Sequence, residues 1–223
     1  MNPPPFFQIF ECQNPQCRLR FPSNLSIEVF QYCPLCNHKV YPVGKPFTNQ
    51  KPINRPQISY PQTIKLLLDN LRSTHNVGSI FRTANCTAIS HIYCCGTTPT
   101  PNHSKFSKSS LTADETISWS YERNSLEIVK ANKHEGYAVV SMEVTDNASP
   151  IFTKSLQEVK STDILLVVGN EISGVDPMIL DESASVVYIP MLGTKTSLNV
   201  SIAAAIALYC FRFSLVSLDW KAN

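Results

Sequence analysis

Four cysteines near the amino terminus have the spacing of a metal site. Cys12 and Cys17 form one pair and Cys33 and Cys36 a second, in the pattern C-x4-C-x15-C-x2-C. Two such pairs can place four thiolates tetrahedrally around Zn²⁺, and four cysteines leave no open coordination position. The alternatives are two disulfides, which a reducing compartment disfavours, and four unrelated thiols, which the paired spacing disfavours. We therefore predict a structural zinc ribbon.

Polar side chains follow two apolar segments that are typical of strands. ILLVV, residues 164–168, runs directly into GNEISGVDP, which carries the carboxylate of Glu171. VVYIP leads through MLGTKT to a helix that Thr196 or Ser197 can cap and whose first turn carries Asn199. Ligands of open α/β sheets bind at the carboxyl ends of strands, so these side chains are candidates for a site. Local roles remain open, because each group can also satisfy a helix terminus or nearby backbone groups.

A candidate arginine lies on a third segment, THNVGSIFRTANC. Its i, i+3, i+4 and i+7 positions form one buried helical stripe, made of Val77, Ile80, Phe81 and Ala84. Asn76 is the expected N-cap. Arg82 is expected on the flank of the apolar face, close to the interior, where packing alone does not explain it.

Strands and helices must alternate to position these side chains. Strands are expected at 64–68, 91–95, 137–144, 164–168 and 186–190, and helices from 76, near 122–134 and from 197. This alternation predicts a mostly parallel α/β sheet. No two glycines stand in G-x-G relation, which excludes a Rossmann dinucleotide fingerprint. Val175 and Asp176 follow the only G-x4-G spacing, which excludes a Walker-type phosphate loop.

Composition divides the chain into three parts. We expect a ribbon at 1–44, an extended proline-rich linker at 45–61 and an α/β domain at 62–223. Residues 1–61 carry six Lys and Arg against two Glu, so this part is the better candidate to meet a polyanion. The chain shows neither a signal peptide nor an apolar stretch long enough to span a bilayer, and a cytoplasmic location is expected.

Three motifs resemble those of a known family. NVGSIFRTA, VVGNEISGV and IPMLGTKTSLNVSIAAAIALY are similar, in order and spacing, to the motifs of the SpoU/TrmH branch of the SPOUT RNA methyltransferases. The resemblance covers about residues 62–216. It implies a domain whose carboxy-terminal part forms a deep trefoil knot, an exception to the general absence of knots, together with a homodimer and bound S-adenosylmethionine.

The resemblance also implies site residues. The implied catalytic residues are Asn76, Arg82, Glu171, Ser197 and Asn199. The implied cofactor-binding residues are Gly169, Asn170, Ile189, Met191, Gly193 and Leu198. In accounts of the family the arginine is the general base, but a guanidinium resists deprotonation, so its role stays open between base and positioning group.

The expected function is S-adenosylmethionine-dependent methyl transfer to a ribose 2′-hydroxyl of tRNA or rRNA. The alternatives are a non-catalytic RNA-binding protein that retains the SPOUT fold and a zinc-ribbon interaction module with an α/β scaffold. An RNA-contacting surface can come from the ribbon, the linker and a loop with Lys105, Phe106 and Lys108, although such a loop can also be merely solvated. Thr112 replaces an expected glycine in this region, and Asn37 replaces one after the second cysteine pair, where Asn tolerates a left-handed backbone.

Overall fold

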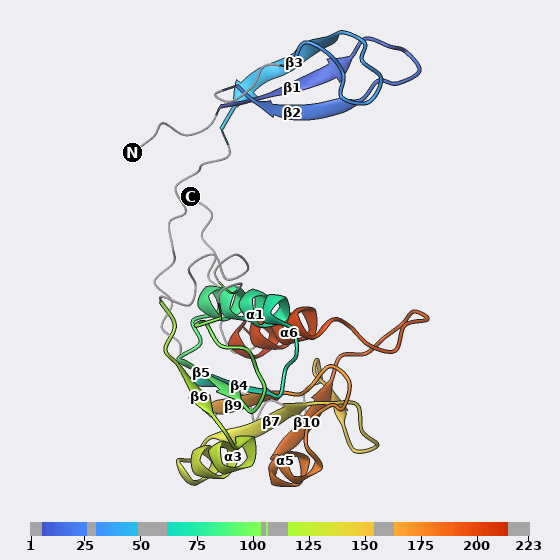
Figure 1. The fold of residues 1–223 in the computed structure, drawn as a ribbon. Helices are drawn as coiled ribbons and strands as arrows, with labels where there is room; N and C mark the ends of the chain where they lie inside the picture. The colour runs from blue at the N-terminus through green and yellow to red at the C-terminus, as the bar shows by residue number, and fades with distance from the viewer. Residues whose placement is uncertain are drawn as a thin grey trace. The chain divides into compact units, whose positions relative to one another are not determined.

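The computed structural model describes residues 6–25, 30–48, 62–103, 106, 116–153 and 163–213. The chain divides into two compact units, Met1–Ile58 and Ser59–Asn223. Each unit has its own sheet, and Figure 1 shows both. Among the helices of the described residues, none combines the length and apolarity needed to cross a membrane.

The amino-terminal unit is a three-stranded antiparallel sheet in the order β2-β1-β3. Its strands are β1 (Phe7–Cys12), β2 (Arg20–Asn24) and β3 (Val40–Phe47). Cys12 ends β1 and Cys17 lies in the turn before β2, whereas Cys33 and Cys36 lie at the turn before β3. Asn37 adopts a φ of 58°, the left-handed conformation expected of it after the second pair. β3 continues three residues past the predicted start of the linker, and most of the linker lies outside the described residues.

The second unit is a seven-stranded parallel sheet with helices on both faces. Its elements are β4 (Ile64–Asp69), α1 (Thr74–Cys86), β5 (His91–Cys95), β6 (Trp119–Glu122), α3 (Ser125–His134), β7 (Ala138–Met142), β8 (Ser149–Pro150), β9 (Ile164–Val168), α5 (Pro177–Glu182), β10 (Ser185–Tyr188) and α6 (Val200–Phe213). The strand order is β6-β5-β4-β9-β7-β10-β8, and all six pairs of neighbouring strands are parallel. The predicted α/β class is therefore confirmed.

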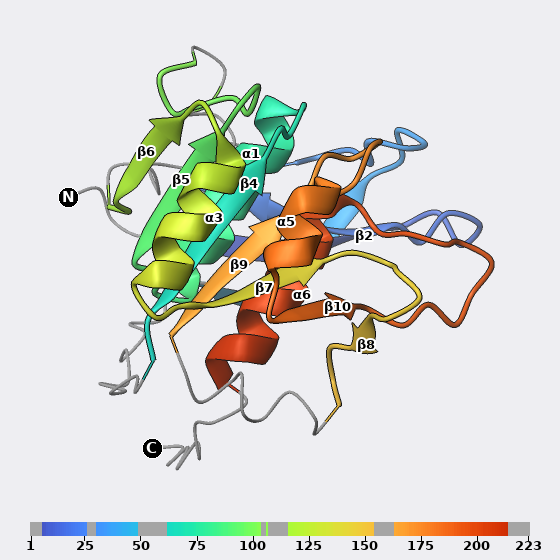
Figure 2. The ribbon, with the colours of Figure 1, turned by 90° about the horizontal axis from the view of Figure 1, so that it is seen from below.

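Two hydrophobic cores sandwich the sheet. Figures 1 and 2 show α1 and α6 over one face and α3 and α5 over the other. Alternate residues of a strand enter different cores, because side chains on a strand point to opposite faces. In β5, Cys94 joins the core under α1 and α6, whereas Cys95 joins the core under α3 and α5. The whole of β9 is buried, as expected of a central parallel strand.

Both predicted helix caps were wrong, and the corrections matter for the site. Ser73 is the N-cap of α1, with its hydroxyl accepting from the backbone N–H of Asn76. α6 begins at Val200, and the side chain of Asn199 accepts from the backbone N–H of Ser201. Asn76 thus lies inside the first turn of its helix, where its side chain is free to bond elsewhere.

A buried arginine of α6 forms hydrogen bonds to the end of α1. Arg212, only 3% exposed, donates to the carbonyl oxygens of Gln62, Thr87 and Ala88 at 2.8, 2.8 and 2.9 Å. Two of these carbonyls belong to the turn that ends α1. A guanidinium suits this place, because its fixed fork can reach several carbonyls that the helix end leaves unpaired.

Candidate functional site

A pocket of about 240 Å³ lies at the carboxyl ends of β7, β9 and β10. Most of its wall is apolar, and two carboxylates, Glu143 and Glu171, lie on it. Of the residues that the resemblance assigned to cofactor binding, five line this pocket: Gly169, Asn170, Ile189, Met191 and Leu198. Gly193 does not line it.

Glu171 is the centre of a hydrogen-bonded chain beside this pocket. Its Oε2 accepts from the backbone N–H of Arg72 at 2.9 Å, and its Oε1 accepts from Asn76 Nδ2 at 2.9 Å. Asn76 Oδ1 in turn accepts from Asn199 Nδ2 at 3.1 Å. Asn199 Oδ1 accepts from the N–H and hydroxyl of Ser201 at 2.9 and 2.7 Å. One residue from each of the three sequence motifs therefore meets at this point.

The carboxylate of Glu171 is held in its charged form. Partial burial raises its pKa, but hydrogen bonds from Asn76 and from the backbone N–H groups of Arg72 and Ser73 outweigh that effect and lower the pKa below its ordinary value. The site therefore keeps a negative charge at neutral pH, which suits a positively charged ligand.

The turn that carries Glu171 is anchored on both sides. Asn170 donates from Nδ2 to the carbonyl of Asn70, and its Oδ1 accepts from the backbone N–H groups of Ile172 and Ser173. Gly169 has no room for a side chain, because a Cβ there would lie 2.5 Å from the backbone of Gly174. Asn170 is therefore best described as the residue that shapes this turn.

Glu143 is a pocket residue that sequence reasoning missed. It follows β7, and its Oε2 accepts from the backbone N–H of Val175 at 3.0 Å while Oε1 accepts from that of Val144 at 2.9 Å. The nearby Gly174 has a φ of 74°, and a Cβ there would lie 2.3 Å from Glu143 Oε2. The available signal was an acidic residue near the carboxyl end of the predicted strand 137–144, in an otherwise mostly apolar segment.

The structure does not bring Arg82 into this cluster. Its side chain is exposed, on the side of α1 away from the buried stripe, so the expectation that it lies close to the interior was wrong. Arg82 follows Asn76 by six residues, which separates the two by about 9 Å along the helix. Ser197 lines the pocket, but the hydrogen bonds of the cluster among the described residues do not include it.

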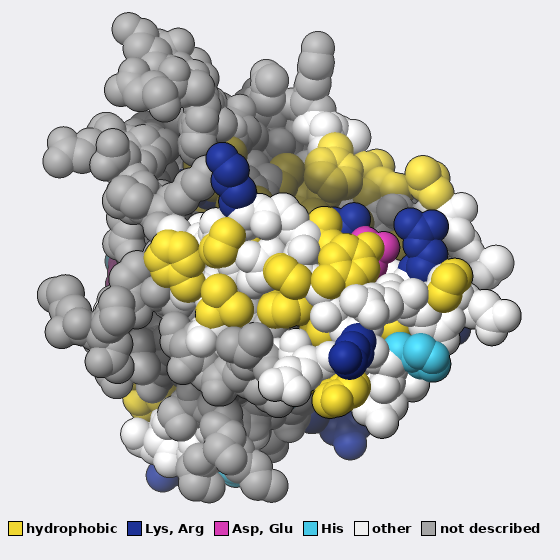
Figure 3. Space-filling view, turned by 90° about the horizontal axis from the view of Figure 1, so that it is seen from above, with side chains coloured by type: hydrophobic (Ala, Val, Ile, Leu, Met, Phe, Trp, Pro, Cys, Tyr) yellow, Lys and Arg dark blue, Asp and Glu magenta, His cyan; other side chains and the backbone are white. Residues whose placement is uncertain are grey.

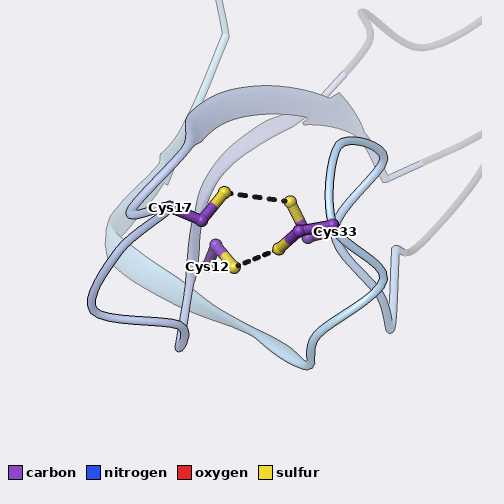
Figure 4. A group of neighbouring side chains, drawn as sticks. Cys12, Cys17 and Cys33 are labelled. Atoms are coloured by element: carbon purple, nitrogen blue, oxygen red, sulfur yellow. Dashed lines mark hydrogen bonds between the residues drawn. The ribbon is translucent and has the colours of Figure 1, made fainter.

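The four cysteines of the ribbon converge as a metal site requires. Their Sγ atoms all lie within 4.8 Å of one another, with Cys12–Cys36 at 3.4 Å and Cys17–Cys33 at 3.8 Å (Figure 4). A tetrahedron of sulfurs at Zn–S distances of about 2.3 Å has edges of about 3.8 Å. The donor set and its spacing therefore fit Zn²⁺.

The surroundings shift the pKa values of the cluster's thiols in opposite directions. Burial raises the pKa of Cys12 to about 12, whereas the backbone hydrogen bond from His38 lowers the pKa of Cys36 to about 6. Four thiolates at neutral pH thus need a cation between them.

One expected RNA-contacting side chain is buried. Phe106 is fully buried and packs edge-on against Phe81 of α1, with ring centroids 5.1 Å apart. It belongs to the core, so its assignment to an RNA surface was wrong. Lys105, Lys108 and Thr112 lie outside the described residues.

Comparisons with known proteins place this chain in a family. The model of the SpoU rRNA Methylase family matches residues 63–209. The chain is 29% identical over 167 residues to the 23S rRNA (guanosine-2'-O-)-methyltransferase RlmB of Acinetobacter baylyi, covering 74% of this chain and 65% of that protein.

Solved structures of RNA-modifying enzymes are also similar to this chain. An AdoMet-bound rRNA methyltransferase from Sinorhizobium meliloti is 26% identical with a TM-score of 0.64, covering 71% of this chain and 60% of that one. A TrmH/SpoU tRNA modifying enzyme from A. aeolicus, 24% identical with a TM-score of 0.57 over 69% of this chain and 76% of its own, shares the fold. The chain thus spans somewhat less than two thirds of the length of RlmB and of the S. meliloti protein.

Proposed function

This chain belongs to the SpoU rRNA Methylase family, and from that premise we propose that it is an S-adenosylmethionine-dependent RNA methyltransferase acting on a ribose 2′-hydroxyl of tRNA or rRNA. The observation that carries the proposal is the hydrogen-bonded chain from Glu171 through Asn76 to Asn199 beside the pocket. It joins the three motifs into one polar cluster at the usual ligand edge of an α/β sheet.

The pocket fits the proposed cofactor by the chemistry of its wall. Ile189, Leu198 and Val168 offer apolar contacts for an adenine ring, and Glu143 and Glu171 offer negative charge for the cationic end of the molecule. When bound, S-adenosylmethionine supplies an activated methyl group on a sulfonium, so that an O–C bond forms as the S–C bond breaks.

The chain's own residues then have to hold the acceptor hydroxyl in line and let its proton leave. Glu171 fixes the orientation of Asn76, and Asn76 fixes that of Asn199, so the two amides present defined hydrogen-bonding groups. Glu171 is a weak base, because its pKa is lowered and both oxygens already accept N–H groups. The proton of the hydroxyl passes to solvent at the exposed mouth of the site.

Arg82 acts on the RNA in this proposal. Its guanidinium stays charged at all ordinary pH values and can hold a phosphate through two parallel hydrogen bonds. Its exposed place on α1 supports contact with a polyanion outside the pocket. Ser197, on the pocket wall, is assigned to the same transfer step as a group that contacts the acceptor ribose.

The quaternary and topological parts of the proposal are a homodimer and a deep trefoil knot. Exposed apolar side chains on α6, Ile202 at 51% and Tyr209 at 47%, support a buried partner surface on that helix. The position of β9 between β4 and β7, with α6 returning to pack on α1, supports the knot.

The ribbon would carry one structural Zn²⁺ on Cys12, Cys17, Cys33 and Cys36. RNA substrates imply a cytoplasmic location.

The test is direct. The purified protein is incubated with isotopically labelled S-adenosylmethionine and with tRNA and rRNA, and the digested RNA is analysed for labelled nucleosides by mass spectrometry. A labelled 2′-O-methylated nucleoside is the expected result and names the base. Cofactor binding without transfer to any cellular RNA would favour a non-catalytic RNA-binding protein, and no cofactor binding would contradict the assignment of the pocket.

A further inference from the structure

The ribbon sheet has one closed face and one open face. Residues paired across an antiparallel sheet point to the same side, so the register of the strands shows which side chains share a face. Gln8, Phe10 and Cys12 point to the closed face, and each is no more than 5% exposed. This face holds the small core of the ribbon and one ligand of the cysteine cluster.

The residues between them point to the opposite side. Phe7 pairs with Phe47, Ile9 with Val43 and Glu11 with Tyr41, and we call Phe7, Ile9, Tyr41, Val43 and Phe47 the open face. Tyr41 is 41% exposed and Phe47 is 42% exposed. The rings of Phe7 and Phe47 stack with centroids 5.9 Å apart. A small unit that leaves two aromatic rings half exposed on one sheet face has a surface suited to a partner.

Basic side chains border the open face. Arg18 and Arg20 both approach Glu11, at 3.7 and 3.6 Å, and their side chains are 74% and 59% exposed. Two arginines share a single carboxylate, so the charges of these three side chains sum to a net positive charge at this edge. Lys45 adds a further exposed cation in β3 between Val43 and Phe47. In the view of Figure 3, exposed hydrophobic side chains lie beside Lys and Arg side chains.

We propose that the open face of the ribbon is a stacking platform for a single-stranded segment of the substrate RNA. The inference rests on the proposed function, which makes RNA the substrate, and it assigns the ribbon a part in holding it. Aromatic rings on a sheet stack unpaired bases, while arginines and lysines along the border bind the phosphates. Glu11 lies four residues from Phe7, so Tyr41 and Phe47 lie about 14 Å apart along the sheet, a span that takes two or three bases. The surplus of cations over Glu11 favours a polyanion over an apolar protein partner.

The test compares the full-length double variant Tyr41→Ala/Phe47→Ala with Tyr32→Ala. Tyr32 is a matched control, because it is 50% exposed in the same unit but precedes Cys33 outside the three strands. The probe is a fluorescein-labelled 12-nucleotide oligouridylate, followed by anisotropy. The double variant should raise the Kd about tenfold or more, since each stacked base depends on its ring, whereas Tyr32→Ala should change the Kd less than twofold. Zinc content and affinity for S-adenosylmethionine should match wild type in both.

The double variant cannot test the platform if it loses its metal and unfolds. A second variant, Arg20→Gln, then tests the phosphate contacts instead. Arg20→Gln should lower the slope of log Kd against log salt by about 0.7, the value for one phosphate contact on a single strand. An unchanged slope, or RNA binding by a folded double variant equal to wild type, would overturn the inference.

The outcomes separate this inference from the function on which it rests. If wild type transfers methyl groups to RNA while the folded double variant shows the wild-type KM for RNA, the function stands and the platform is refuted. If wild type neither binds nor methylates any RNA, the proposed RNA methyltransferase function is refuted, and the stacking platform is refuted as well. A double variant with raised KM and unchanged kcat at saturating RNA supports both, because the platform contributes equally to ground-state and transition-state binding.

Discussion

Replacing Glu171 by Gln tests whether the polar cluster works as a directed chain of hydrogen bonds. Position 171 must accept at both oxygens, from the backbone N–H of Arg72 and from Asn76 Nδ2. A carboxamide accepts at one end only, so its NH₂ group meets another donor at the other. Asn76 cannot correct this by turning its amide, because its oxygen already accepts from Asn199 Nδ2. Only a carboxylate satisfies every donor in the chain.

The magnitude follows from the loss of one charged hydrogen bond. Such bonds contribute about 1.5–3 kcal/mol, and because the Glu171 side chain is exposed we take the lower part, about 1.5–2 kcal/mol. Applied to the transition state, this predicts a fall in kcat of roughly 10- to 30-fold. Glu182→Gln is the control, since Glu182 is ion-paired with Lys133 at 2.8 Å on the α3 and α5 side of the sheet.

The assay is steady-state methyl transfer, with calorimetric binding of S-adenosylhomocysteine as a second measurement. A kcat for Glu171→Gln within threefold of wild type would refute the directed chain.

The dependence of stability on pH gives an independent check. Because the folded protein lowers the pKa of Glu171 below its ordinary value of 4.5, the stabilisation is complete above that value and is lost as the pH falls through the lowered pKa. Wild type should therefore lose its stability advantage over Glu171→Gln only below about pH 4.5.

Four further substitutions give definite expectations. Cys33→Ser should abolish the one zinc per chain, measured by metal analysis, and folded wild-type protein without metal would contradict the ribbon assignment. Arg82→Ala should keep the affinity for S-adenosylmethionine and lose methyl transfer, so a near-normal rate would remove it from the mechanism. Phe106→Ala should lower the free energy of unfolding by about 3–5 kcal/mol in urea, because a fully buried ring is removed from the core against Phe81. Arg212→Met should lower it by about 2–4 kcal/mol, because three backbone carbonyls lose their donors; an unchanged urea midpoint would show that these bonds are dispensable.

Local patterns in the sequence predicted the strands and helices well where burial is complete. The bounds of 91–95 and 164–168 match β5 and β9. For β9 the reason is that a central parallel strand is apolar throughout and ends where polar residues begin. The edge strand β6 and the two-residue β8 were not expected, since short edge strands carry mixed residues and depend on their neighbours for pairing. The helix caps were misassigned because several adjacent side chains can cap, and only the packed structure selects one.

The sequence by itself determined the chemistry available to this protein. It supplied the paired cysteines, the three polar motifs and the parallel α/β class, since residue type and spacing are local properties. Tertiary structure decided which of these groups meet. Glu171, Asn76 and Asn199 join although 95 and 123 residues separate the bonded pairs. Arg82 faces outward and Phe106 inward, because the side of a helix or loop that is buried depends on what packs against it.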